Sequence, residues 1–200
     1  MKMMKFVLAA VAFAGFFGFE KSARSQLVFN IQETTTGVEL TGSGSFHFGI
    51  GFSVQDTPAG ESMFPSFGLL EVGPTVPKFG IFQNAITSGP GSFGPGSFAI
   101  GGTSSGDTFG FTANQKHVKL PFNYVSGAHL SGQTTWAGAT LTSLGVTPGQ
   151  YNWTTVSGGI NDSIRLNVSA VPEASPLTLG AITAAVAGLV TYYRRRRVTA

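Results

Sequence analysis

QLVFNIQETTTGVEL, which spans residues 26–40, shows how the middle of this chain folds. The apolar side chains of Leu27, Phe29 and Ile31 recur at every second position, which places them on one face of a β-strand. The segment TTTG that follows is an apparent turn, and strand-like sequence continues after it. This stretch therefore predicts two strands joined by a turn.

The same alternation returns along the chain as far as residue 170. The apolar sets are Phe46, Phe48, Ile50 and Phe52; Phe98 and Ile100; Phe109 and Phe111; Val118, Leu120, Phe122 and Tyr124; Tyr151 and Trp153; and Ile164, Leu166 and Val168. Gly, Pro, Asn, Asp or Ser follows each set, and no helical period interrupts them. This pattern predicts an all-β domain over residues 26–170, an antiparallel sandwich of jelly-roll-like form.

Proline and glycine predict three departures from regular strands. Pro121 interrupts an apolar set, which predicts an edge strand or a bulge at that point. Several prolines in residues 56–80 predict a loop with short strand fragments. GPGSFGPGSF, residues 89–98, is a repeated pentapeptide, and we expect a glycine-rich loop whose two phenylalanines pack on the rim of the sandwich.

Composition limits the functions open to the domain. The 200-residue chain has 28 Gly and 18 Phe but only 10% charged residues, which suits short strands and tight turns. It has no cysteine, which excludes disulfides, thiolate nucleophiles and cysteine-ligated metals. Residues 26–170 hold four basic against seven acidic residues, a net charge of −3. These four cannot form the basic face that a nucleic-acid partner needs.

No pattern in the domain predicts catalysis, so we expect a protein that is not an enzyme and has no catalytic residue, metal or cofactor. His47, His117 and His129 lack the tight spacing of a metal site, and His47 points to solvent on the strand interpretation. A zinc or copper site would require His117 and His129 to meet across adjacent strands. A hydrolase would need two carboxylates, or a histidine and an acid, in one cleft. Glu33 and Glu39, on either side of TTTG, are expected to be solvated strand residues.

Three large aromatic residues leave a binding alternative open. Trp136, Tyr151 and Trp153 could stack against sugars if they lay on an open face of the sheet. Because Tyr151 and Trp153 share one strand face, we favour their burial in the core. An exposed row with Trp136 or Trp153 would favour a carbohydrate-binding module, and burial of both would count against it.

The first 25 residues have the three-part layout of a secretory signal peptide. A lysine-containing start precedes an apolar run of 14 residues, which is short for a membrane span, and a polar stretch follows. Ala23 and Ser25 occupy the positions three and one before a cut ahead of Gln26. We therefore expect a signal helix, export through the Sec translocon and cleavage by signal peptidase.

The carboxyl-terminal stretch VPEASPLTLGAITAAVAGLVTYYRRRR spans residues 171–197. Residues 177–193 carry no charge, and as a helix they would be about 26 Å long, close to the hydrocarbon thickness of a bilayer. Arg194, Arg195, Arg196 and Arg197 follow directly and would stay on the cytoplasmic side. We expect a single transmembrane helix that anchors the protein in the inner membrane with its domain outside the cytoplasm.

The order of these carboxyl-terminal parts resembles the PEP-CTERM sorting signal of Gram-negative bacteria that secrete exopolysaccharide. The motif, residues 171–176, begins Val171-Pro172-Glu173, and Ala174 stands where the family usually has a second proline. The resemblance implies that exosortase, a membrane protease, recognises Val171, Pro172 and Glu173 and removes the helix. It also implies that the arginine cluster is a retention signal. ETTTGVELTGSGSF, YVSGAHLSG and LGVTPGQYNWT look like the domain of a group of such proteins, for which the family offers no established activity.

These expectations divide the chain into a signal peptide (residues 1–25), a β-sandwich domain (26–170) and a sorting signal (171–200). They predict a structural or adhesive protein of the cell surface or extracellular matrix, without catalysis of its own. The alternative is a carbohydrate-binding module for exopolysaccharide. The expected partners are the translocon, signal peptidase, exosortase, the membrane and exopolysaccharide, and no nucleic acid.

Overall fold

Strands β1 (Gln26–Thr34) and β2 (Gly37–Gly44) form the predicted pair at the start of the domain. They are antiparallel, and Thr34 pairs with Gly37, so a two-residue turn connects them. Leu27, Phe29 and Ile31 are all fully buried, as the alternation predicts. The computed structural model describes residues 25–49 and 52–170.

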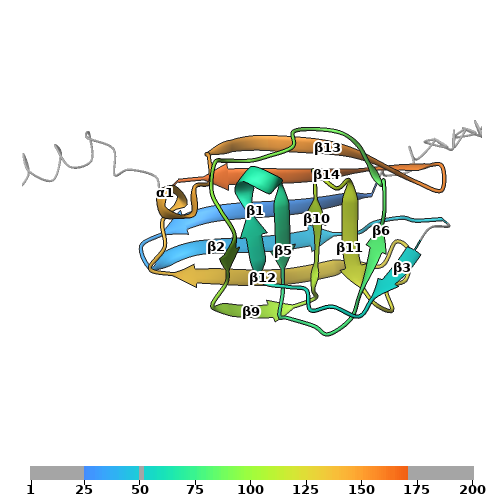
Figure 1. Cartoon of the computed structure of the whole chain (residues 1–200), viewed down its shortest axis with the longest axis horizontal. Coiled ribbons are helices and arrows are strands. Elements are labelled where there is room, and N and C mark those ends of the chain that lie inside the picture. The colour runs from blue at the N-terminus through green and yellow to red at the C-terminus, as the bar shows by residue number, and fades with distance from the viewer. Residues whose placement is uncertain (1–24, 50–51, 171–200) are drawn as a thin grey trace, which may run out of the picture.

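Two seven-stranded sheets make up the described part of the chain (Figure 1). The first, sheet A, has the order β7 (Ile86–Ser88), β13 (Gly149–Ser157), β14 (Ile160–Ser169), β1, β2, β12 (Leu130–Ala137) and β9 (Thr103–Gly106). The second, sheet B, has the order β3 (Phe52–Gln55), β6 (Phe79–Phe82), β11 (His117–Pro121), β10 (Phe109–Thr112), β5 (Leu69–Val72), β4 (Ser62–Phe64) and β8 (Ala99–Ile100). Two short helices, η1 (Pro65–Phe67) and α1 (Leu141–Leu144), complete these elements. The all-β class is confirmed.

One strand pair contradicts the prediction of a purely antiparallel arrangement. Strands β1 and β14 run parallel, with Gln26 opposite Ser163 and Gln32 opposite Ser169. The first and last strands of the domain thus lie side by side in the middle of sheet A (Figure 1). Side-chain alternation has a period of two in either direction, so the pattern could not reveal which way neighbouring strands run.

The core lies between the two sheets, whose strands cross in Figure 1 rather than run alongside one another. The ring of Phe29 in sheet A packs against Phe109 and Phe111 of sheet B at centroid distances of 5.4 and 5.5 Å. Gly42 permits this close approach, because a Cβ there would lie 2.9 Å from Phe109 Cζ and from Val72 Cγ1. Each fully buried phenylalanine contributes about 1.5–3 kcal/mol through loss of apolar surface to water.

The predicted strand over Phe46, Phe48, Ile50 and Phe52 is wrong in its first half. Residues 45–49 lie outside the strands, and β3 begins only at Phe52. Side chains from distant segments take the place of a neighbouring strand: the N–H groups of Phe46, His47 and Phe48 donate to Tyr124 Oη, Asp162 Oδ2 and Ser126 Oγ, respectively. Phe46 is nevertheless buried, as the apolar alternation predicts.

The proline predictions are met in part. Residues 56–80 form loops with short strands, as predicted, and β4 and β5 among them belong to sheet B. Pro121 does not mark an edge or a bulge, because β11 pairs in regular register with β10 on one side and β6 on the other. It is tolerated because it lies beyond the last residue that pairs with β10, so only Phe79 of β6 lies opposite it.

The two phenylalanines of GPGSFGPGSF lie in different environments, which corrects the prediction that both pack on the rim. Phe93 is fully buried in the core, whereas 53% of Phe98 is exposed. Phe98 makes an edge contact with Phe64 at a centroid distance of 6.3 Å. None of the helices within the described residues is long and apolar enough to cross a membrane.

Candidate functional site

The outer face of sheet A carries a continuous row of polar side chains, which we call the amide row. Strand register places its members opposite one another on six neighbouring strands: Gln150, Asn167, Asn30, Thr41, Gln133 and Ser105. At roughly 4.8 Å between strands, the row is about 24 Å long. Leu27, Phe29 and Ile31 point to the core, so alternation directs the intervening residues of β1 to this face.

Hydrogen bonds fix one end of the amide row. Gln150 Nε2 donates to Asn167 Oδ1 at 3.0 Å, and Asn167 Nδ2 donates to Asn30 Oδ1 at 2.8 Å. At the other end Thr41, Gln133 and Ser105 are exposed to solvent. Their amide and hydroxyl groups can both donate and accept hydrogen bonds, so this end can bind a polar ligand.

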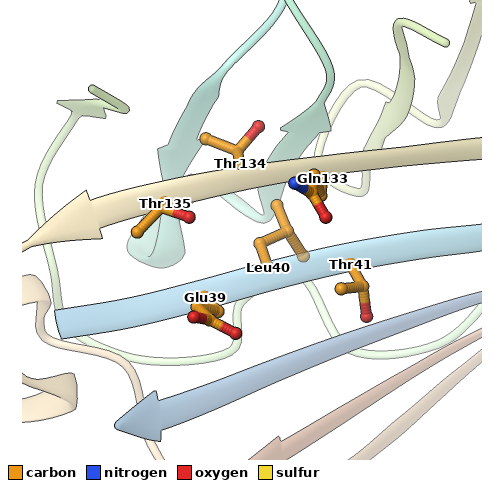
Figure 2. Close-up of a pocket in the computed structure, with 6 residues that line it drawn as sticks. All are labelled: Glu39, Leu40, Thr41, Gln133, Thr134 and Thr135. Carbon is orange, nitrogen blue, oxygen red and sulfur yellow. The ribbon is translucent and has the colours of Figure 1, made fainter. Parts of the chain in front are cut away.

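Two shallow hollows lie beside the exposed end of the row. The smaller has a volume of about 80 Å³, and its walls are Glu39, Leu40, Thr41, Gln133, Thr134 and Thr135 of strands β2 and β12 (Figure 2). The larger has a volume of about 190 Å³ and shares Thr41 and Gln133 with it. Enclosed small-molecule sites usually measure about 300–1,000 Å³, so these hollows fit single groups of an extended ligand better than a whole small molecule.

Little charge accompanies this polar surface. Glu39 is the acidic wall residue of the smaller hollow, and Arg165 on β14 donates to Asn152 Oδ1 at 3.2 Å. The larger hollow is lined by Thr, Ser, Gly and Gln. Recognition on this face would therefore depend on hydrogen bonding rather than on charge attraction.

His47 lies in surroundings that the sequence did not predict. His47 Nδ1 lies 3.6 Å from Asp162 Oδ2, and its side chain is 41% exposed, whereas only 2% of the Asp162 side chain is exposed. Sequence reasoning missed this pair, because a strand over residues 45–49 would have directed His47 straight to solvent. The backbone N–H of His47 also donates to the same carboxylate, at 2.6 Å, so Asp162 positions this segment.

His117 and His129 do not lie on adjacent strands. His117 begins β11 of sheet B, whereas His129 directly precedes β12 of sheet A. Burial, reinforced by the charge of Lys119, lowers the pKa of His117 below its usual 6.5. Among the described residues, no group of three or more histidine, aspartate or glutamate side chains could hold a metal ion.

Six of the seven acidic residues in the described part of the chain contact separate partners. Their contacts are Glu33 with the Leu141 N–H, Asp56 with Lys78, Glu61 with Thr75 and Ser104, Glu71 with Lys119, Asp107 with the Ser131 N–H, and Asp162 with His47. Glu39 is exposed, as expected. Glu33 is not simply solvated: it is half-buried, and its carboxylate accepts a hydrogen bond at the start of α1 at 2.8 Å.

Trp136 and Trp153 belong to the core, as favoured for Trp153 from the sequence, and Tyr151 packs against the core. Trp136 is 6% exposed and Trp153 1%, and the Trp153 ring lies 4.6 Å from that of Phe111. Tyr151 is half-buried and donates to the Thr147 carbonyl at 2.9 Å. Burial of both tryptophans counts against a carbohydrate site built on their rings.

Most of the predicted processing residues lie outside the described residues, namely Ala23, Val171, Pro172, Glu173, Arg194, Arg195, Arg196 and Arg197. Ser25 and Gln26 are described. Ser25 is buried, its Oγ lies 2.5 Å from Ser45 Oγ, and Gln26 starts β1 in the middle of sheet A. A cut ahead of Gln26 would therefore have to precede folding of the sheet, as cleavage during export does.

Comparison of the chain with protein families, with curated proteins and with solved structures found no match.

Proposed function

We propose that this chain is an exported protein of the cell surface or extracellular matrix, structural or adhesive, with no catalysis of its own. The observation that carries the proposal is the order of parts at its carboxyl end: Val171-Pro172-Glu173, the uncharged residues 177–193 and the cluster Arg194–Arg197. By its resemblance to a PEP-CTERM signal, this segment anchors the protein in the inner membrane until exosortase removes it. The domain, a sandwich of jelly-roll-like form in this proposal, stays outside the cytoplasm.

Two features of the described residues support a non-catalytic role. Six of the seven acidic side chains in the described residues contact separate structural partners, such as the Leu141 N–H for Glu33 and Lys119 for Glu71. The hollows on sheet A are small and open, and they are lined mainly by hydroxyl and amide groups. Such a surface suits repeated weak contacts with a matrix better than it suits the conversion of an enclosed substrate.

The proposal is tested by changing Val171, Pro172 and Glu173 together to alanine and following the protein in its native host. We expect wild type to lose its carboxyl-terminal segment and leave the inner membrane, and the triple variant to keep both. Ser175→Ala, in the same segment, is the matched control and should behave as wild type. If wild type and variant both kept an intact carboxyl terminus and stayed with the membrane, the segment would be only an anchor, and the proposed sorting would be wrong.

The amide row favours a second candidate, a polysaccharide-binding surface. Sugar hydroxyls both donate and accept hydrogen bonds, as do the amide and hydroxyl groups of Thr41, Gln133 and Ser105. The row is open at its exposed end and is long enough for several sugar units of an extended chain. Because it carries little charge, we propose a neutral polysaccharide as its ligand.

Affinity electrophoresis tests this candidate with dextran and hydroxyethyl cellulose as neutral probes and alginate as an acidic probe. We expect a neutral probe to retard the purified protein, and Thr41→Ala with Gln133→Ala to weaken the retardation several-fold. Asn161→Ala, which removes an exposed amide of β14 outside the row, should leave it unchanged. Equal mobility with and without every probe would rule against these ligands, and equal retardation of both variants would rule against the amide row.

A further inference from the structure

A buried ion pair lies on the face of sheet B that points away from sheet A. Lys119 on β11 and Glu71 on β5 each pair in register with Gly110 of the intervening strand β10. Lys119 Nζ donates directly to Glu71 Oε1. Only 17% of the Lys119 side chain and 5% of the Glu71 side chain are exposed. The two side chains therefore meet over the glycine, in a nearly closed site.

Gly110 is what allows the two side chains to meet. A Cβ at this position would lie 2.1 Å from the Leu70 carbonyl oxygen and 3.0 Å from Glu71 Cγ. The space above the middle strand is thus occupied by the neighbours of Gly110 rather than by a side chain of its own. Any larger residue would displace Glu71 from its place beside Lys119.

The surroundings of the pair exclude water and hold the carboxyl group in one orientation. Glu71 Oε2 accepts hydrogen bonds from the Gly60 N–H at 2.9 Å and from Ser62 Oγ at 3.1 Å. Lys119 Nζ lies 5.3 Å from the centre of the Phe79 ring. Phe79 also belongs to a small apolar cluster with Ala59 and Ile81 on this side of the sheet.

We propose that Lys119 and Glu71 condense to an intramolecular isopeptide bond. Three features that this reaction needs are present together: an amine in contact with a carboxyl group, little surrounding water, and two donors aimed at the other carboxyl oxygen. Condensation would also remove two charges from a nearly closed site, because the amide it forms is neutral. The inference is independent of the proposed export and sorting of the protein.

The bond forms without a co-reactant. A proton passes from Lys119 Nζ to Glu71 Oε1, and the resulting neutral amine attacks the Glu71 Cδ atom. Negative charge then develops on Oε2, where the Gly60 N–H and the Ser62 hydroxyl stabilise it as an oxyanion hole does. The Cδ–Oε1 bond breaks, Oε1 takes a second proton from the nitrogen and leaves as water, and the Cδ=Oε2 double bond is restored. One ammonium and one carboxylate thus give one amide and one water.

The product would be a covalent cross-link between β5 and β11, the two strands on either side of β10. It joins β5 to β11 over β10, so Glu71 and Lys119 would stay linked even in the unfolded chain. Closing a loop in this way restricts the unfolded state, as a disulfide does, in a chain that has no cysteine. The exposed ion pair of Lys78 and Asp56, whose atoms lie 3.0 Å apart, lacks this burial and stays unlinked.

The test is peptide mapping of the purified full-length chain by trypsin and mass spectrometry, which does not depend on how the termini are processed. We expect no cleavage after Lys119, and a branched peptide that joins the Glu71 and Lys119 segments and is one water lighter than their sum. Two separate linear peptides, with cleavage after Lys119, would show an ordinary ion pair and overturn the proposal.

Two substitutions of lysine sharpen the result. Lys119→Arg keeps the positive charge but cannot form the amide. The intact mass of this variant should therefore exceed that of linked wild type by the mass difference between arginine and lysine plus the mass of one water. Lys78→Arg at the exposed pair is the matched control and should keep the branched peptide. A branched peptide in Lys119→Arg, or its loss in Lys78→Arg, would place the link elsewhere and contradict the assignment to Lys119 and Glu71.

Discussion

The outer face of sheet A and the outer face of sheet B differ in what covers them. On sheet A, Thr41 and Gln133 are open to water beside shallow hollows. On sheet B, Glu71 is closed in by Gly60, Ser62 and Lys119. The loop that carries Gly60 is held down by two hydrogen bonds between Ala59 and Val76, at 3.1 and 2.9 Å. Among the described residues, the outside of sheet A around Thr41 and Gln133 is thus open to solvent, whereas the centre of the outside of sheet B, around Glu71, is covered by its own chain.

The largest expected effect comes from filling the space between Lys119 and Glu71. In Gly110→Ala the new Cβ meets the Leu70 carbonyl oxygen at 2.1 Å, a backbone atom that cannot simply turn away. Because the added Cβ also displaces Glu71 from Lys119, overpacking and the broken pair act together, and we expect a loss of at least about 5 kcal/mol in the free energy of unfolding. Chemical denaturation measures it. The control is Gly102→Ala, whose Cβ would have its nearest neighbour at 3.6 Å; equal losses would show that the site above Gly110 is not tightly packed.

The next largest effect is expected at Glu71 on the outer face of sheet B, and Glu39 on the outer face of sheet A serves as its comparison. Glu71→Ala leaves the Lys119 charge buried without its partner and the Gly60 N–H and Ser62 hydroxyl without their acceptor, so we expect a loss of about 3–5 kcal/mol. Glu39→Ala, on the exposed face of sheet A, should change the free energy of unfolding by less than about 0.5 kcal/mol. Denaturation curves of the two variants measure this difference. Similar stabilities would remove the contrast between a closed face and an open one.

A smaller effect is expected within the amide row. Asn30→Ala and Asn167→Ala each remove the hydrogen bond between these side chains, which is exposed to solvent. We expect a coupling energy of about 0.5 kcal/mol between the two positions in a double-mutant cycle. A coupling of several kcal/mol would mean that this end of the row is structurally essential rather than simply solvated.

The smallest effect is a pH dependence on the outer face of sheet B. The pKa of His117 is lowered mainly by burial, so the folded protein releases this proton more readily than the unfolded chain does. Above pH 6.5, the ordinary pKa of histidine, His117 should therefore leave the free energy of unfolding unchanged. As the pH drops from 6.5 toward the lowered pKa of the folded protein, the free energy of unfolding should fall. Thermal unfolding of wild type and His117→Gln between pH 5 and 7.5 measures this dependence. If the variant lost stability with falling pH as steeply as wild type, the dependence would belong to another group.

The sequence predicted the features that depend on neighbouring residues. Period-two alternation is local, so the strand face of Leu27, Phe29 and Ile31 and the burial of Trp153 could be predicted. The direction of β14 beside β1 could not, since alternation looks the same in parallel and antiparallel strands. The segment around His47 was also mispredicted, because distant side chains of Tyr124 and Asp162 hold it in place of a strand.

Both candidate sites escaped prediction because they depend on register between strands far apart in the chain. The amide row exists only once Gln150, Asn167 and Asn30 are brought opposite one another by the pairing of β13, β14 and β1. Lys119 and Glu71 meet only because β10 places Gly110 between them. In the sequence, each of these residues is an ordinary polar residue of a strand.

The most direct test of the proposed export and sorting is to map both ends of the mature protein in fractions of its native host. We expect protein recovered outside the inner membrane to begin at Gln26 and to lack residues 177–197. A chain recovered from the cytoplasm with residues 1–25 still attached would contradict export, and a released chain that retains the arginine cluster would contradict sorting through the carboxyl-terminal signal.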